Sequence, residues 1–333
     1  MKQNITLKEI ASLANVSPAT VSRVINQNGR FTKETEQRVK SIIKKYEYSP
    51  NQLAKGLRTN HSRIIAVIVP DITNIYFANL ILAIQTRLFA KDYPVVIYNT
   101  NESKEVEQKC LNYIRAQSVS GVIYINGNED IEDEFLKTVP TIYIDRAPKK
   151  DNLPHAQYVY SQNEYGGYLA TKALIECGCR KPAVLTERYG TFVMRQRYEG
   201  YKKALKETGI DNIESRVFIP TAISYDAAYK IISDAINDGV EFDGLFCQTD
   251  WLASGAIDAL LAHNIKVPQQ VKVVGFDNIP ISYLSHLPFS TIEQKSAMIG
   301  HYVADTIIDM IDGINNLDLI KEFPVEYIKR ETT

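Results

Sequence analysis

Near the N-terminus, the end of one helical pattern is followed directly by the start of another, and this constrains the start of the fold. Thr6 and Glu9 form a capping box, and four apolar residues follow at the spacing of one helix face. This pattern ends at residues 15–16, and Ser17 followed by Pro18 starts a new one, because serine caps helices and proline suits the first helical turn. The sequence therefore predicts two short helices joined by one tight turn.

The second helix has a buried side and an open side. Val21, Val24 and Ile25 are spaced to face inward. The open side keeps small and polar residues, namely Pro18, Ala19, Thr20, Ser22 and Arg23. A third helix, capped by Thr32, repeats the apolar spacing at Val39, Ile42, Ile43 and Tyr46. Such a helix-turn-helix places its second helix in the major groove of DNA, whereas the alternative is an ordinary helical hairpin.

Charge is distributed unevenly along the chain. Residues 1–60 hold 11 Lys+Arg against 4 Asp+Glu, a balance of +7. Because the whole chain has 38 Lys+Arg and 39 Asp+Glu, 27 basic and 35 acidic residues remain for the rest, a balance of −8. A basic head on an acidic body favours a polyanionic partner, and the alternative is a solvated helical face.

A fourth helical pattern follows at residues 49–58. Ser49 and Gln52 form a second capping box, with Leu53 and Leu57 on one face. Barely two turns of helix are marginally stable in water, so this segment is expected to fold only when it packs against a partner. It is interpreted as a hinge.

Several classes of protein lack support in the sequence. No apolar segment resembles a signal peptide or a membrane span, which favours a soluble, cytoplasmic protein. The four cysteines, Cys110, Cys177, Cys179 and Cys247, lack metal-ligand spacing and are expected to be reduced thiols. The five histidines are scattered, so neither a metal nor a cofactor is expected.

The rest of the chain alternates buried strands with amphipathic helices. One series of apolar runs covers residues 64–69, 95–98, 121–125 and 141–144. A second has strands at 183–185, 244–247 and 271–275, with helices near 167–176, 195–208, 225–237 and 252–263. This pattern predicts two α/β lobes built on parallel sheets. No phosphate loop, G-x-G-x-x-G after a strand, H-E-x-x-H or G-x-S-x-G is present, so an enzyme is not expected.

Polar residues stand where the predicted strands end. Asp145 and Arg146 follow one strand, and Asp250 and Asp277 lie at the ends of two others. Ligands of open α/β sheets bind beyond the carboxyl ends of strands. Carboxylates and a guanidinium there can hold sugar hydroxyls, although a helix cap or a surface ion pair is the alternative for each.

Three strings near the N-terminus resemble the LacI family of bacterial regulators. They are Ile5-Thr6-Leu7-Lys8-Glu9-Ile10-Ala11, the run from Asn15 to Asn26, and Tyr48-Ser49-Pro50-Asn51. The resemblance implies that Leu57 wedges between base pairs from the minor groove, whereas a domain-packing role is the alternative. The expected DNA contacts are Thr6, Ser17, Pro18, Ala19, Thr20, Ser22, Arg23, Asn26, Arg30, Asn51, Lys55 and Leu57.

The body resembles the periplasmic-sugar-binding fold of the same family. The landmarks are residues 69–74, 166–170, 197–201 and 274–278. The resemblance implies that residues 290–294 and a helix near 298–311 return the chain to the first lobe. It also places Tyr76, Phe77, Asp145, Arg146, Arg197, Ile223, Asp250 and Asp277 in an effector cleft, and Trp251 is a further candidate for stacking on a sugar.

The sequence as a whole predicts a two-part regulator. Residues 1–48 are expected to form an all-α helix-turn-helix head, 49–61 a hinge helix and linker, and 62–333 a two-lobed α/β core for effector binding and dimerisation. The expected partners are a palindromic operator, a small effector such as a sugar, and a second copy of the chain. The competing readings are a sugar transport protein, which needs a signal peptide, and an enzyme on the same fold.

Overall fold

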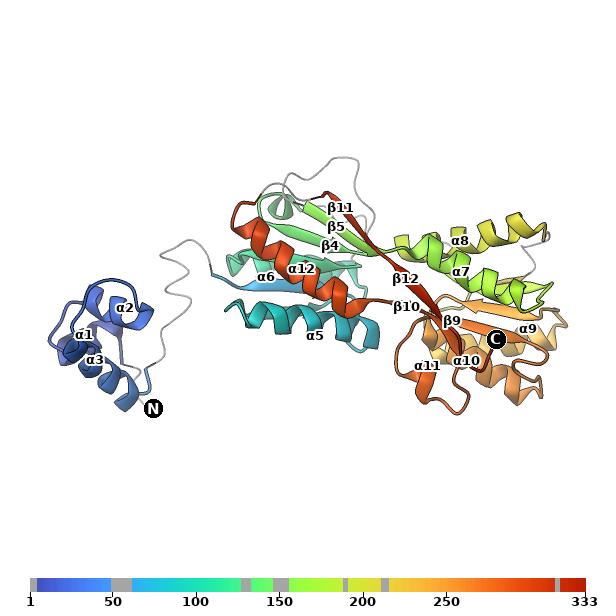
Figure 1. The fold of residues 1–333 in the computed structure, drawn as a ribbon, viewed down its shortest axis with the longest axis horizontal. Helices are drawn as coiled ribbons and strands as arrows, with labels where there is room; N and C mark the ends of the chain where they lie inside the picture. The colour runs from blue at the N-terminus through green and yellow to red at the C-terminus, as the bar shows by residue number, and fades with distance from the viewer. Residues whose placement is uncertain are drawn as a thin grey trace. The chain divides into compact units, whose positions relative to one another are not determined.

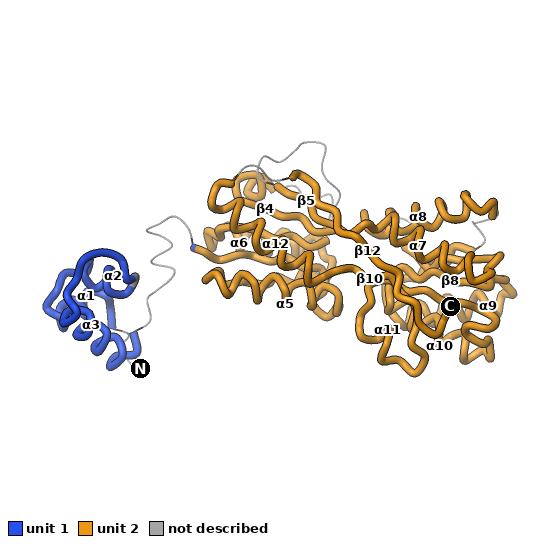
Figure 2. The backbone as a smooth tube through the Cα atoms, in the orientation of Figure 1, with its two compact units in different colours: residues 1–62 blue, residues 63–333 orange. Residues whose placement is uncertain are grey.

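The computed structural model describes residues 5–48, 62–126, 133–145, 156–187, 191–210, 216–314 and 318–333, with the side chain of Asn26 excepted. The chain divides into two compact units, residues 1–62 and 63–333 (Figure 2). The predicted hinge at 49–61 lies outside the described residues.

The first unit is a three-helix head. Its helices are α1 (Leu7–Leu13), α2 (Pro18–Asn26) and α3 (Lys33–Lys45). Thr6, Ser17 and Thr32 cap them as predicted, and each side-chain oxygen accepts a hydrogen bond from a backbone N–H three residues on. The core contains Ile10, Ala11, Ala14, Val21, Val24 and Val39. The prediction for Tyr46 was wrong: it is the C-cap of α3 and 45% exposed, while Tyr48 packs on the core instead.

The first lobe of the second unit is a six-stranded parallel sheet. Its order is β11-β5-β4-β3-β1-β2. The strands are β1 (Ile65–Val69), β2 (Val95–Asn99), β3 (Gly121–Ile125), β4 (Thr141–Ile144), β5 (Ala156–Ser161) and β11 (Ile320–Phe323). The helices are α5 (Ile75–Phe89), α6 (Lys104–Ala116), the 3-10 helix η1 (Glu134–Lys137) and α12 (Ser296–Ile311). Because the central strands are buried on both faces, they read as continuous apolar runs.

The second lobe has a sheet of the same size. Its order is β12-β10-β9-β8-β6-β7, parallel except for the β10–β12 pair. The strands are β6 (Pro182–Leu185), β7 (Val217–Phe218), β8 (Gly244–Cys247), β9 (Lys272–Asp277), β10 (Ser290–Gln294) and β12 (Val325–Ile328). The helices are α7 (Asn163–Glu176), α8 (Phe192–Thr208), α9 (Tyr225–Asn237), α10 (Asp250–Ala262) and α11 (Ile281–Leu284).

The chain passes between the two lobes three times (Figure 1). It enters the second lobe after β5, returns to the first after β10, and crosses again between β11 and β12. The helix predicted near 298–311 does return to the first lobe, where α12 packs on α5. The prediction for residues 290–294 was wrong, since this segment pairs with β9 inside the second sheet.

Candidate nucleic-acid interface and effector site

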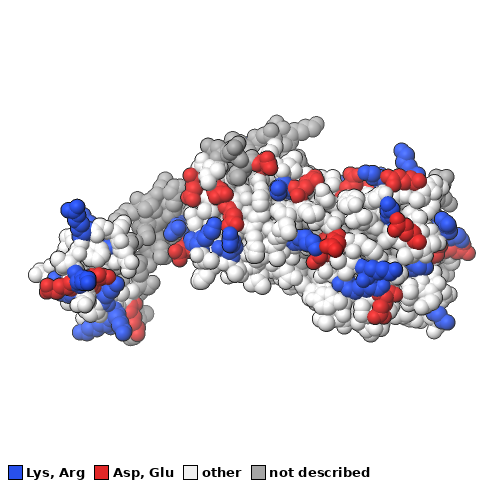
Figure 3. Space-filling view, viewed as in Figure 1, with Lys and Arg blue, Asp and Glu red and all other residues white. Residues whose placement is uncertain are grey.

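The outer face of α2 is open and small. Ser17, Pro18, Ala19 and Arg23 are exposed, and Thr20 and Ser22 are partly exposed. The side-chain oxygen of Ser17 accepts a hydrogen bond from the Thr20 N–H at 3.1 Å, which fixes the start of the helix. The N-terminus of a helix carries partial positive charge, so this end of α2 suits a phosphate. The described head, residues 5–48, carries eight Lys+Arg and four Asp+Glu (Figure 3).

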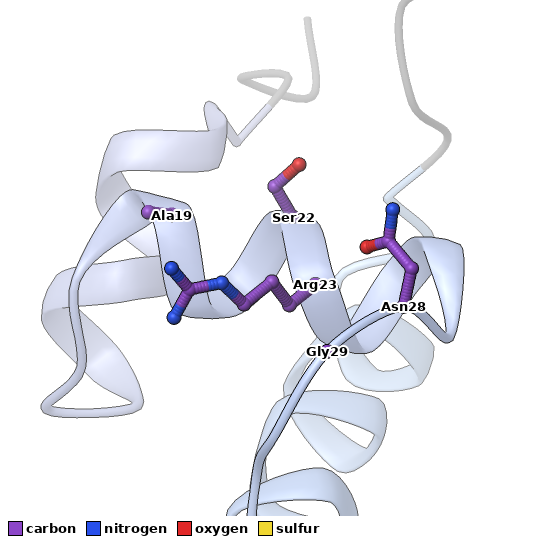
Figure 4. Close-up of a pocket in the computed structure, with 5 residues that line it drawn as sticks. All are labelled: Ala19, Ser22, Arg23, Asn28 and Gly29. Atoms are coloured by element: carbon purple, nitrogen blue, oxygen red, sulfur yellow. The ribbon is translucent and has the colours of Figure 1, made fainter.

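A shallow groove runs along this face (Figure 4). Ala19, Ser22, Arg23, Asn28 and Gly29 line it. The Arg23 side chain extends along α2 towards Ala19, so its guanidinium lies over a surface cleared of large side chains. An exposed planar cation of this kind is suited to a groove of DNA, where arginine reads guanine through two hydrogen bonds.

The remaining predicted DNA contacts are either exposed elsewhere on the head or lie outside the described residues. Arg30 is exposed. Thr6 is exposed too, and its hydroxyl donates to the Glu9 carboxylate at 2.8 Å within the capping box of α1. Asn51, Lys55 and Leu57 lie outside the described residues, as does the side chain of Asn26.

Polar side chains from both lobes meet at the carboxyl ends of the strands. We call Tyr76, Asp145, Ser161, Arg197, Asp277 and Gln294 the interlobe cluster, and all six are buried. Tyr76 and Asp145 belong to the first lobe, and the Tyr76 hydroxyl donates to Asp145 Oδ2 at 3.5 Å. Arg197 and Asp277 belong to the second lobe, with Arg197 Nη1 3.6 Å from Asp277 Oδ1. The structure thus brings together four of the predicted effector residues.

Arg197 is held firmly within this cluster. Its Nε donates to Asn163 Oδ1 at 2.8 Å, and its Nη1 donates to the backbone oxygen of Gln248 at 2.6 Å. The guanidinium also lies 3.7 Å from the centre of the Phe276 ring. A buried cation with these contacts is fixed in one orientation.

Two carboxylates share this single arginine. Burial raises the pKa of Asp145 to about 6, although Arg197 opposes the change. Burial likewise raises the pKa of Asp277 to about 6, again against the effect of Arg197. Mutual repulsion between the carboxylates adds to the rise at Asp277. The cluster is therefore short of positive charge among the described residues and would gain from further hydrogen-bond donors.

The cluster and its surroundings contain buried hydrogen-bond acceptors that such donors would satisfy. Among the described residues, Asp145 Oδ1, Gln248 Oε1 and Gln294 Oε1 are buried without a hydrogen-bond partner. The amide nitrogens of both glutamines are already engaged, with Met194 O and Asp277 Oδ1 respectively. A buried acceptor without a partner costs free energy, which a ligand carrying hydroxyl groups would recover.

The other predicted effector residues are placed differently. Asp250 is fully buried, and its oxygens accept hydrogen bonds from the Ile279 N–H at 2.8 Å and the Thr291 hydroxyl at 2.6 Å. This geometry favours a structural carboxylate there. Phe77 and Ile223 pack partly buried against the cores of the first and second lobes. Trp251 is partly buried on α10, and Arg146 lies outside the described residues.

Comparison with known proteins identifies the family. Residues 6–51 match the model of bacterial regulatory proteins of the lacI family, and residues 171–333 match a periplasmic binding protein-like domain. The ribose operon repressor of Halalkalibacterium halodurans is 32% identical over 98% of this chain and 97% of the relative. The chain belongs to the LacI family of bacterial regulatory proteins. As a member, it is a DNA-binding transcriptional regulator.

Other LacI-family proteins are similar over their full length. The HTH-type transcriptional repressor PurR of Haemophilus influenzae is 30% identical over 98% of both chains. The lac repressor dimer bound to operator and the anti-inducer ONPF superposes with a TM-score of 0.90 over 99% of both chains, at 24% identity. The relatives are repressors, which supports the prediction of a regulator rather than an enzyme.

Three polar residues of this LacI-family chain were missed from the sequence. Ser161 ends β5 in the sheet of Asp145, whereas Gln248 follows β8 and Gln294 ends β10 in the sheet of Asp277. The signal that could have found them is their position, because each is a polar residue that ends or directly follows a strand. A lone serine or glutamine carries no motif of its own.

The two raised pKa values predict how the stability of the ligand-free LacI-family protein depends on pH. Below pH 6 the folded state binds protons at Asp145 and Asp277 that the unfolded chain does not bind until about pH 4. The free energy of unfolding should therefore rise by about 1 kcal/mol for each carboxylate as pH falls from about 7.5 to about 5.5. Thermal unfolding of the wild type beside Asp145→Asn and Asp277→Asn checks this, since each variant should lose its share of the gain. An equal pH dependence in all three proteins would contradict it.

Proposed function

We propose that the chain is a homodimeric repressor that binds a palindromic operator through α2 and responds to a small, hydroxyl-rich effector at the interlobe cluster. The observation that carries the effector proposal is the set of buried acceptors without partners around Arg197, contributed by both lobes. A ligand that bridges Asp145 and Asp277 would bind one arrangement of the lobes better than others, and would thereby shift the affinity for operator.

The chemistry of the cluster favours an uncharged effector. Among the described residues in and beside the cluster, three of the buried atoms without partners are acceptors, namely Asp145 Oδ1, Gln248 Oε1 and Gln294 Oε1, and the fourth, Ser161 Oγ, can accept or donate. Two carboxylates stand beside one arginine. Sugar hydroxyls donate hydrogen bonds, whereas a phosphate would add more acceptors and more negative charge. The sugar named by the ribose operon repressor gives a first compound to test.

A thermal-shift screen of the full-length protein tests the effector proposal. Neutral sugars, with D-ribose first, are compared with their phosphates, because a ligand of the native state must stabilise it. We expect at least one neutral sugar to raise the melting temperature. Stabilisation by phosphorylated sugars alone would contradict the proposed effector class.

Operator recognition provides the next prediction. A duplex selected by the wild type from a random pool should bind with an affinity that falls about a thousandfold or more between about 50 and about 200 mM salt, because each phosphate contact releases counterions. Arg23→Ala should reduce the ratio of affinities for selected and random duplex by about tenfold or more. Both constants come from titrations of labelled duplex.

Lys40→Ala serves as the control for Arg23. Lys40 is also an exposed cation of the head, but its ammonium contacts the Glu36 carboxylate at 2.6 Å on the same helix. Its removal should leave the affinity ratio unchanged. If Arg23→Ala lost affinity equally for selected and random duplex, Arg23 would contact the phosphates and would not read a base.

Exposed apolar side chains support a dimer. Leu82 and Phe89 on α5 are 61% and 72% exposed, and their seven-residue spacing puts them on one helix face. On α11, Tyr283 and Leu284 are 48% and 74% exposed. We propose that a second copy of the chain covers these faces, as the lac repressor relative is itself a dimer.

Sedimentation checks the dimer. The double variant Leu82→Glu, Phe89→Glu should dissociate at least about a hundredfold more readily than the wild type, because two apolar contacts become charged in each copy. The control is Tyr113→Glu on α6, which is 64% exposed. If the double variant sediments as wild type does, this face of α5 lies outside the interface.

Location and domain boundaries complete the proposal. None of the described helices is long and apolar enough to cross a bilayer. We propose that the protein acts in the cytoplasm, where a bacterial operator lies. As boundaries we propose residues 1–48 for the head, 49–61 for the hinge and 62–333 for the core, which is close to the division into two compact units.

A further inference from the structure

Gly29 stands out among the glycines with a left-handed backbone. Its φ is +99°, and it follows the left-handed C-cap of α2 at Gln27. The other described glycines of positive φ are Gly178, Gly209, Gly239 and Gly313, and a Cβ added to any of them would meet nothing within 4 Å. A Cβ added to Gly29 would lie 3.1 Å from Arg23 Cδ and 3.5 Å from Arg23 Cγ.

The Arg23 stem therefore lies close to Gly29. In Figure 4 Gly29 lies beside the start of this stem, which leads to a guanidinium on the side of Ala19. The backbone fixes the relative position of the two residues, because the backbone oxygen of Arg23 accepts the Asn28 N–H at 3.1 Å. The bare α-carbon of Gly29 gives the Arg23 methylenes a surface to lie on at close range.

We infer that Gly29 is a positioning residue for base reading: its missing side chain lets the stem of Arg23 lie flat along α2, so that the guanidinium points into the DNA groove. The inference rests on the proposed role of Arg23. Holding a long side chain in its bound orientation reduces the entropy lost on binding and favours bidentate contact with one base. A methyl group at position 29 would displace the Arg23 stem by a few tenths of an ångström and so change the place of the guanidinium at its end.

A double-mutant cycle on the full-length protein tests the inference. The four proteins are wild type, Gly29→Ala, Arg23→Ala and the double variant. The probes are the duplex selected by the wild type and its single-base-pair variants, among which Arg23→Ala identifies the base pair that Arg23 reads. In the wild-type background we expect Gly29→Ala to reduce discrimination at that base pair about tenfold and to leave the other base pairs unaffected. In the Arg23→Ala background, Gly29→Ala should reduce the affinity for the selected duplex less than it does in the wild-type background.

The cycle separates contact from backbone strain. Gly178→Ala is the matched control, because it places alanine at a φ of +93° with no atom nearby. Thermal unfolding of Gly178→Ala gives the cost of the backbone alone, with which that of Gly29→Ala is compared. Equal losses of affinity for the selected duplex in the two backgrounds, or full discrimination by Gly29→Ala at the base pair that Arg23 reads, would overturn the inference. If Arg23→Ala itself kept full discrimination for every base pair, the proposed role of Arg23 would fail first and the inference with it.

Discussion

Replacing Arg197 by methionine is expected to lower the free energy of unfolding by about 3 to 5 kcal/mol at pH 7.5 and to abolish measurable effector binding. Arg197 is 3% exposed, and its guanidinium is the described cation that faces both Asp145 and Asp277. Its removal leaves two buried carboxylates uncompensated, together with the freed acceptors of Asn163 and Gln248. Chemical denaturation and titration with the effector found by thermal shift measure the two losses.

The pH dependence of this variant gives an internal check. Without the cation, the pKa values of both carboxylates should rise further, so the loss of stability should shrink as pH falls towards about 5. Arg87→Met is the control, because Arg87 forms an exposed ion pair with Asp305, whose removal should cost less than about 1 kcal/mol. Similar small costs for the two variants would mean that Arg197 does not compensate the cluster.

Gly167→Ala is expected to destabilise the second lobe by about 3 kcal/mol and to weaken effector binding at least about tenfold. Helices α7 and α8 cross at Gly167 and Gly200. A Cβ on Gly167 would lie 2.1 Å from the backbone oxygen of Arg197, and one on Gly200 would lie 1.9 Å from that of Glu164. Because these obstacles are backbone atoms, relief requires the helices to separate, which moves Arg197 itself.

Two measurements distinguish crowding from a general effect of alanine. Gly209 is the C-cap of α8 with a φ of +67°, and a Cβ added there would meet nothing within 4 Å. Gly209→Ala should therefore introduce only backbone strain and leave effector affinity unchanged. In Gly167→Ala the loss of affinity should accompany the loss of stability. Wild-type affinity in a destabilised Gly167→Ala protein would show that Arg197 does not depend on the crossing.

The head was predictable from the sequence because its determinants are local. Thr6, Ser17 and Thr32 begin their helices as expected, since a cap depends on residues within one turn. Tyr46 was assigned to the core because it continues the apolar spacing of its helix. The helix ends there, and the spacing no longer determines where the ring lies.

Strand β11, which the sequence did not predict, depends on a distant partner. β11 carries Lys321 and Glu322 between its apolar ends and pairs with β5, which lies more than 150 residues earlier. The sequence of such an edge strand resembles a loop until its partner is known.

The effector site was predicted in part. Strand ends placed Asp145 and Asp277 each at the carboxyl edge of its own sheet, where ligands of open α/β sheets bind. Asp250 comes soon after strand β8, but its oxygens accept hydrogen bonds from Ile279 and Thr291, which belong to other segments of the lobe. Only the folded chain shows which carboxylate is already satisfied. The hydrogen-bond needs of Gln248 and Gln294 likewise emerge only from their neighbours.

The threefold passage between the lobes also has a consequence for synthesis on the ribosome. The head contains only neighbouring segments and can fold as soon as it leaves the exit tunnel. Neither sheet of the sensor is complete until β11 and β12 have been translated, because these late strands pair with β5 and β10. A nascent chain should therefore acquire its DNA-reading surface well before it can sense an effector.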